Sequence, residues 1–176
     1  VAGADAKYVG ASKCKTCHKK ELIGDQSGKW EKSGHAKAFK TLQGDEAIAI
    51  AKEKGISGPP SEAAECLKCH ATAATLGAGD VEKKPLSNSD GVQCETCHGP
   101  GSAYKKKKVM ADHEKSLAAG LIVPDEKTCT QCHNEESPTF KGFDYAEASK
   151  KIDHMIPKDV KGRYIEAEKA QKAEGK

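Results

Sequence analysis

The amino-acid sequence predicts a mainly α, irregular fold in a single domain that spans residues 1–176. A length of 176 residues suits one domain and leaves little room for two separate cores. Apolar residues recur at helical spacing, and no segment alternates apolar and polar residues long enough to indicate a sheet. Only 36% of the residues are hydrophobic and 31% are charged, so we expect that side chains alone do not fill the interior.

Helical periodicity is readable in five segments, which glycine and proline separate from one another. Gly55 and Pro157 supply stop signals for the second and the fourth of these segments. A short hairpin near residues 81–92 is the one β element that the pattern permits. The expected helices are residues 28–42, 45–54, 107–119, 145–156 and 163–173, with polar loops at 55–60, 77–91 and 99–101.

Composition and charge argue against two classes of partner. No run approaches the roughly 18 to 20 apolar residues that cross a bilayer, so no membrane span is expected. The formal charge is +3, but lysines and acidic residues alternate along the chain, and this pattern does not suggest nucleic acid. The run Lys105–Lys108 is interpreted as a solvated face, with docking to an acidic protein as the alternative.

All eight cysteines occur in four pairs with two residues between the members, and a histidine follows every pair. This C-x-x-C-H pattern is typical of c-type haem attachment, in which two thiols add to the haem vinyl groups and the histidine binds the iron. Pooled zinc ligands and thioredoxin-like dithiols are the alternatives, but neither explains the histidine after every pair. The four copies are Cys14, Cys17 and His18; Cys66, Cys69 and His70; Cys94, Cys97 and His98; and Cys129, Cys132 and His133.

Four covalent haem c groups per chain would supply the apolar surface that the composition lacks. Each macrocycle buries more apolar area than a side chain can, and this burial stabilises the folded state. We therefore expect helices and long loops wrapped around four covalent haems, and an apoprotein that is largely unfolded. Because haem c is attached outside the cytoplasm, we also expect a periplasmic or otherwise extracytoplasmic protein.

The axial ligands of the irons can be counted from the seven histidines. The four motifs use one histidine each as the proximal ligand, which leaves His35, His113 and His154 as distal candidates in helix-compatible sequence. Three distal imidazoles for four irons leave one iron without a second histidine, and identical subunits cannot supply it. Met110, Met155, a lysine, a terminal amine or water are the alternatives for that position.

Several stretches resemble the cytochrome c-554 family of tetrahaem cytochromes. They are residues 30–38, residues 91–101 around the third motif, and Asp112 with His113. The likeness also includes the order of the four motifs and the position of His154. It implies three haems with two histidine ligands each, and a second haem, on His70, with only one.

The resemblance also implies which distal histidine serves which haem. It leaves the haem of His70 open and places residues 138–140 over that open site. The family's best-known member accepts electrons from hydroxylamine oxidoreductase, so the resemblance makes a multihaem oxidoreductase a candidate partner. The implied pairs, with the distal histidine first, are His113 with His18, His35 with His98, and His154 with His133.

Electron transfer is the predicted function, because an iron with two histidine ligands has no vacant site for a substrate. The alternative is a redox enzyme in which the open haem of His70 binds nitric oxide, nitrite, hydroxylamine or peroxide, with nitric oxide reduction as a side activity. No unpaired histidine is left to donate a proton there, and the lysine-ligated C-x-x-C-K motif of related nitrite reductases is absent, so the sequence favours a carrier. We expect a redox protein as donor, another as acceptor, and a monomer or a weak homo-oligomer.

Overall fold

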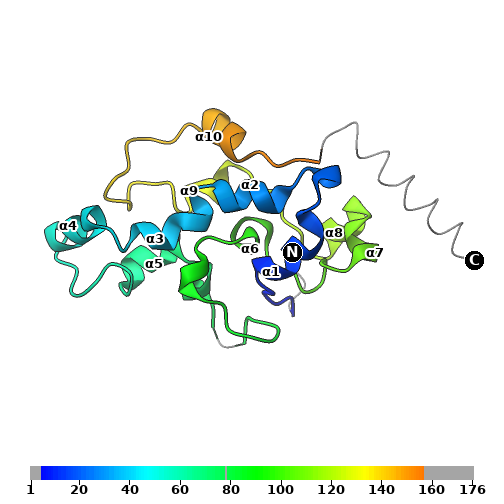
Figure 1. Ribbon diagram of the computed structural model, residues 1–176, viewed down its shortest axis with the longest axis horizontal. Helices are drawn as coiled ribbons and strands as arrows, with labels where there is room; N and C mark the ends of the chain where they lie inside the picture. Colours follow the sequence, from blue (N-terminus) through cyan, green and yellow to red (C-terminus); the bar gives the residue numbers. More distant parts are fainter. Residues whose placement is uncertain (1–4, 78, 157–176) are drawn as a thin grey trace, which may run out of the picture.

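The computed structural model describes residues 5–77 and 79–156, and it confirms a mainly helical fold (Figure 1). The helices are short, from four to nine residues, and loops join them. They are α1 (Ala11–His18), α2 (Gln26–Lys32), α3 (Ala38–Thr41), α4 (Asp45–Glu53), α5 (Ala64–His70), α6 (Cys94–His98), α7 (Lys107–Met110), α8 (His113–Ala118), α9 (Glu126–Thr130) and α10 (Tyr145–Ile152). Short 3-10 turns are η1 (Glu21–Ile23), η2 (His35–Lys37), η3 (Thr72–Thr75) and η4 (Asn88–Asp90).

Two of the expected helices are broken in the structure. Residues 28–42 form α2, η2 and α3, because Ser33 takes an extended backbone conformation at the end of α2. Residues 107–119 form α7 and α8, because the side chain of Asp112 accepts a hydrogen bond from the N–H of Lys115 and so starts a new helix. Polar side chains that compete for backbone groups therefore override the helical periodicity.

The other expected elements have mixed outcomes. The helix predicted at 45–54 is confirmed as α4, whereas α10 ends at Ile152 because Asp153 is extended. The expected hairpin does not form in the described residues, since residue 81 makes an isolated parallel bridge with Tyr8 and residues 88–90 form η4. The predicted helix at 163–173 lies outside the described residues. The single-domain expectation stays a prediction.

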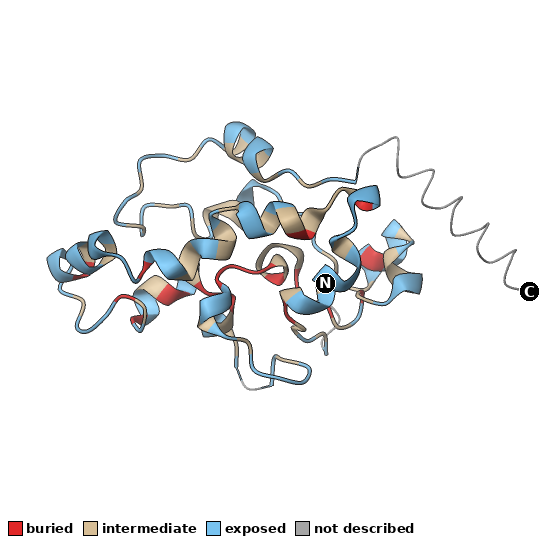
Figure 2. Cartoon of the chain, in the orientation of Figure 1, coloured by how far each residue is buried: buried red, intermediate tan, exposed pale blue. Residues whose placement is uncertain are grey.

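The apolar core is small, as the composition indicates. Leu42, Leu67 and Ala71 form a buried cluster, against which Phe39 and Cys66 pack. Buried segments lie along the inner sides of the loops and helices, while the outer faces are exposed (Figure 2). The protein interior thus offers few side-chain contacts around the four motifs.

The helices are spread along the long axis of the molecule (Figure 1). Helices α4 and α5 lie at one end of this axis, α7 and α8 lie at the other, and α6 lies between them. None of the helices in the described ranges has the length and apolar character that a bilayer crossing needs. This extended arrangement distributes the four cysteine motifs through the molecule.

Candidate haem-binding sites

Each C-x-x-C-H motif lies on or directly after a short helix that sequence periodicity did not predict. Helices α1, α5 and α6 end at the motif histidine, and the fourth motif continues from α9 into a turn in which the N–H of His133 donates to the carbonyl of Cys129. Residues three and four apart lie on the same side of a helical turn, so this spacing presents both thiols and the imidazole together. All eight cysteines are free of disulfides, which leaves every thiol available.

The thiols of different motifs are neighbours, and they connect the motifs in the order first, third, fourth, second. The neighbouring thiols are Cys14 with Cys94, Cys97 with Cys129, and Cys132 with Cys69. Contact with Cys94 and burial raise the pKa of Cys14, while the same contact lowers the pKa of Cys94. Burial, followed by the proximity of Cys69, raises the pKa of Cys132 to about 12. The four attachment points therefore form one continuous series.

Two pairs of histidine rings face each other across the structure. The ring centroids of His35 and His133 lie 6.0 Å apart with planes at 73°. The centroids of His98 and His154 lie 5.8 Å apart with planes at 81°. Because an imidazole nitrogen binds a transition metal at about 2.0 Å, two rings on opposite sides of one iron have centroids about 6 Å apart. Both pairs fit a metal held between two imidazoles.

These ring pairs are the reverse of the assignment that the family resemblance implied. That assignment placed His35 with His98 and His154 with His133, whereas His35 lies beside His133 and His154 lies beside His98. The physical reason is tertiary: the carbonyl of His35 accepts a hydrogen bond from the N–H of Val92 at 3.0 Å, which holds η2 in place. Sequence order alone contains no information about this contact.

The histidines are also oriented through their second ring nitrogen. In four of them Nδ1 faces a protein oxygen that can only accept a hydrogen bond, so Nδ1 carries the proton and Nε2 is left free for a metal. The pairs are His18 with Gln26 Oε1 at 3.3 Å, His70 with the Ala38 carbonyl at 2.8 Å, His98 with the Ile122 carbonyl at 3.0 Å, and His154 with the Ile152 carbonyl at 2.7 Å. This tautomer is the one that binds iron.

Burial favours the neutral, ligating form of two histidines. Desolvation is the main cause that lowers the pKa of His35, and the nearby His133 lowers it further. Desolvation also lowers the pKa of His98, against the opposing hydrogen bond to the Ile122 carbonyl. A metal-binding imidazole must be unprotonated, so both environments fit iron ligation.

The remaining three sequence-predicted histidines, His18, His70 and His113, belong to no ring pair of this kind in the described part of the chain. His113 is the first residue of α8 and is exposed. His70 ends α5, where its Nδ1 also lies 3.3 Å from Thr41 Oγ1. His113 thus lies in an α-helix as expected, whereas the other two distal candidates do not, because His35 opens η2 and His154 follows the end of α10.

Space and unused polar atoms near the motifs fit a large cofactor. A cavity of about 260 Å³ lies between the second and fourth motifs, with Cys69 and Cys132 among its lining residues. The side-chain Nε2 of Gln93 is buried and has no hydrogen-bond partner within the described residues. An orphaned donor of this kind suits a group that carries acceptors, such as a haem propionate.

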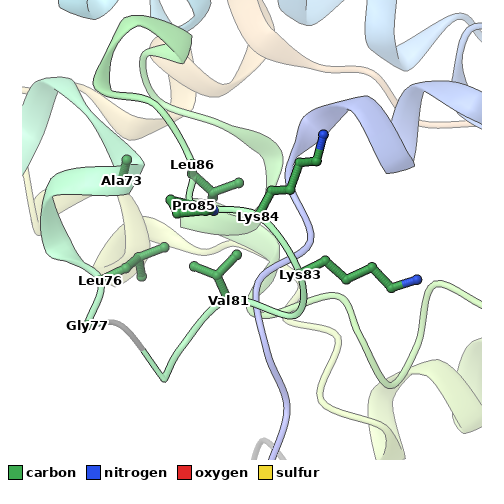
Figure 3. Close-up of a pocket in the computed structure, with 8 residues that line it drawn as sticks. All are labelled: Ala73, Leu76, Gly77, Val81, Lys83, Lys84, Pro85 and Leu86. Carbon is green, nitrogen blue, oxygen red and sulfur yellow. The ribbon is translucent and has the colours of Figure 1, made fainter.

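A second cavity, of about 390 Å³, is not a metal site. The side chains of Ala73, Leu76, Val81 and Leu86 surround it, and the ammonium groups of the neighbouring lysines point away (Figure 3). Among residues 5–77 and 79–156, no cysteine or histidine lines this cavity. It therefore contributes nothing to iron ligation.

Sequence reasoning missed several residues that support the site. Phe143 stacks on the ring of His133 at 4.9 Å between centroids. Glu95, the residue after Cys94, is buried and accepts backbone hydrogen bonds. A carboxylate inside the third motif was the available signal for Glu95, whereas the sequence contains no signal for Phe143 or for the carbonyls that orient the histidines.

Comparisons with known proteins show what this chain is similar to. The family profile described as cytochrome c554 and c-prime matches residues 13–99. Cytochrome c-554 of Nitrosomonas europaea is 31% identical over 159 residues, which cover 79% of this chain. That alignment spans 63% of the relative's own length. The solved structure of reduced cytochrome c554 from the same organism matches with a TM-score of 0.62 and 23% identity, over 87% of this chain and 86% of that chain.

Proposed function

Because the chain belongs to the cytochrome c554 and c-prime family, we propose that it carries electrons through four covalently attached haems. Covalent haem c is the cofactor of this family, and it supplies reversible one-electron oxidation and reduction. The observation that supports the count of four is the set of four motif helices, with all eight cysteines free and six of them neighbouring a cysteine of another motif.

The ring pairs support an assignment of the axial ligands. His133 and His35 would hold one iron, and His98 and His154 another. By exclusion, His113 is left for the iron of His18. The iron of His70 would then have a single histidine ligand, which agrees with the count of seven histidines for eight axial positions.

The protein's own groups prepare this chemistry in two ways. The Nδ1 hydrogen bonds of His18, His70 and His98 hold each ring in one tautomer, so that ligation does not require reorientation. The series of neighbouring thiols keeps the four attachment points close together. Short distances favour electron transfer from haem to haem over chemistry at separate centres. A carrier is the function that these features favour.

We also propose an extracytoplasmic location, with one redox protein as donor and another as acceptor, and a monomer or weak homo-oligomer. A multihaem oxidoreductase suits the donor role. Lys105 of the basic run forms an ion pair with Glu82, so this run is at least partly neutralised and remains the weaker candidate for a docking surface.

Three measurements test the proposal. The intact mass of the purified protein should exceed that of the polypeptide by four haems, and any smaller increment would contradict the count. Carbon monoxide added to the reduced protein should perturb about one haem in four, because one iron has a single histidine. Complete resistance to carbon monoxide would mean that another residue ligates that iron, and rapid turnover of nitric oxide or hydroxylamine would favour the enzyme alternative.

A further inference from the structure

A buried carboxylate of the third motif lies against the backbone that leads into the first motif. Glu95 is only 1% exposed. Its oxygens accept hydrogen bonds from the N–H of Val9 at 2.9 and 3.1 Å, of Gly10 at 2.7 Å and of Gly101 at 2.6 Å. These contacts are all donors, which is the arrangement that an ionised carboxylate requires. No ion pair within the described residues includes Glu95.

The backbone of Gly10 and Gly101 lies close to the Glu95 carboxylate. A Cβ at Gly101 would lie 3.0 Å from Glu95 Oε1, so a side chain there would displace the carboxylate. Gly10 has a φ of 84°, a left-handed conformation that glycine adopts readily. The backbone N–H dipoles of three residues therefore surround the negative charge.

The field of this charge reaches both neighbouring attachment sites. Glu95 follows Cys94 in the third motif, and its charge also acts on the thiol of Cys14 in the first. After desolvation, Glu95 is the largest cause that raises the pKa of both Tyr8 and Tyr104. Charges act over longer distances inside a protein than in water, because the surroundings screen them weakly.

We propose that Glu95 lowers the reduction potentials of the two haems attached at the first and third motifs. The inference rests on the proposed function, since it requires those haems to be present. Reduction adds one electron from the donor protein and removes one positive charge from the iron, with no proton transferred. A fixed buried anion stabilises the more positive ferric state, so it makes reduction of these two centres less favourable.

The test is a redox titration of the purified four-haem protein, followed by absorbance, for Glu95→Gln and Glu95→Asp. Glu95→Gln removes the charge and keeps the shape, so two of the four components should move to higher potential. A tenfold change in the reduction equilibrium, about 59 mV for a one-electron couple, is the expected size. Glu95→Asp keeps the charge, so its potentials should stay near those of the natural protein even if the shorter side chain lowers stability.

Glu65→Gln is the matched control. Glu65 also adjoins a motif cysteine, Cys66, and its charge raises the pKa of that thiol, but Glu65 is exposed to water, which screens its charge. Its removal should therefore shift all four components far less than Glu95→Gln shifts two of them. Equal shifts in Glu95→Gln and Glu95→Asp, or no shift in either, would overturn the proposal and leave Glu95 a purely structural residue. The intact mass of every variant reports haem content separately, so loss of haem is distinguished from failure of the inference.

Gln93→Glu tests the proposal if Glu95→Gln does not fold with its four haems. Gln93 is 2% exposed, and its Oε1 accepts a hydrogen bond from the N–H of Ala11 at 2.7 Å, while its Nε2 has no partner among the described residues. Gln93→Glu would add a carboxylate of the same shape beside the same two motifs. It should lower the potentials of both haems, and unchanged or higher potentials would contradict the proposal.

Discussion

The imidazoles of His98 and His154 lie 5.8 Å apart between ring centroids, with planes at 81°, although they belong to distant parts of the chain. His98 ends α6, and His154 follows the end of α10. A backbone carbonyl holds Nδ1 of each ring, at Ile122 for His98 and at Ile152 for His154. The two free Nε2 atoms can therefore serve one iron.

This relationship predicts which variants affect the same haem. Replacing the distal ligand in His154→Ala should convert one low-spin ferric haem to high-spin, because its iron loses one of two imidazoles. His98→Met, which changes the proximal ligand, should alter the same low-spin signal in the electron paramagnetic resonance spectrum. Carbon monoxide binding by reduced His154→Ala should rise from about one haem to about two.

The second ring pair provides the matched control. His35→Ala and His133→Met should together alter a different low-spin signal from the one that His154→Ala removes, since their rings face each other. If His154→Ala instead removes the signal that His133→Met alters, the assignment implied by the family resemblance is correct and the observed ring pairs do not represent ligand pairs.

The raised pKa of Tyr104 predicts that the free energy of unfolding falls at high pH. Its hydroxyl donates to the carbonyls of His98 and Gly99, and desolvation, with the charge of Glu95, raises its pKa. Above about pH 10 the unfolded chain loses the tyrosine proton while the folded chain keeps it, so the free energy of unfolding falls as the pH rises. Chemical unfolding of the four-haem protein between pH 8 and pH 11 measures this fall.

Tyr104→Phe separates this effect from the titration of other groups. At pH 8 the variant should be less stable by about 1 kcal/mol, because two carbonyls lose their hydrogen-bond donor. Above pH 10 the difference should narrow, since phenylalanine has no proton to lose. A difference that stays constant up to pH 11 would contradict the raised pKa of Tyr104.

Asp25 is predicted to stabilise the start of α2. It has a left-handed backbone with φ 43°, and its side chain accepts a hydrogen bond from the N–H of Gly28 at 3.0 Å. Asp25→Ala should lower the free energy of unfolding by about 1–2 kcal/mol, because it removes the cap and places alanine in a strained conformation. Asp25→Asn keeps both the acceptor and the tolerance for this backbone, so thermal unfolding should distinguish the two. Equal losses in both variants would show that the charge, and not the cap, stabilises α2.

The sequence predicted the local features of the site because they depend on adjacent residues. A thioether attachment needs two cysteines and a histidine within one helical turn, and this spacing is visible in Cys94, Cys97 and His98 without a structure. The prediction of a mainly α fold depended on periodicity in the same way. Periodicity failed at Asp112, where a side chain captured a backbone N–H and began a new helix.

The number of histidines, the motif chemistry and the helical class were thus determined by the sequence itself. The tertiary structure alone decided which distal ring faces which proximal ring, and it brought the carboxylate of Glu95, in the third motif, beside the start of the first motif. The physical reason is that these relationships depend on contacts between residues far apart in the chain, such as His35 with Val92 and Glu95 with Gly10. Such contacts form only when the whole chain packs, and no local pattern encodes them.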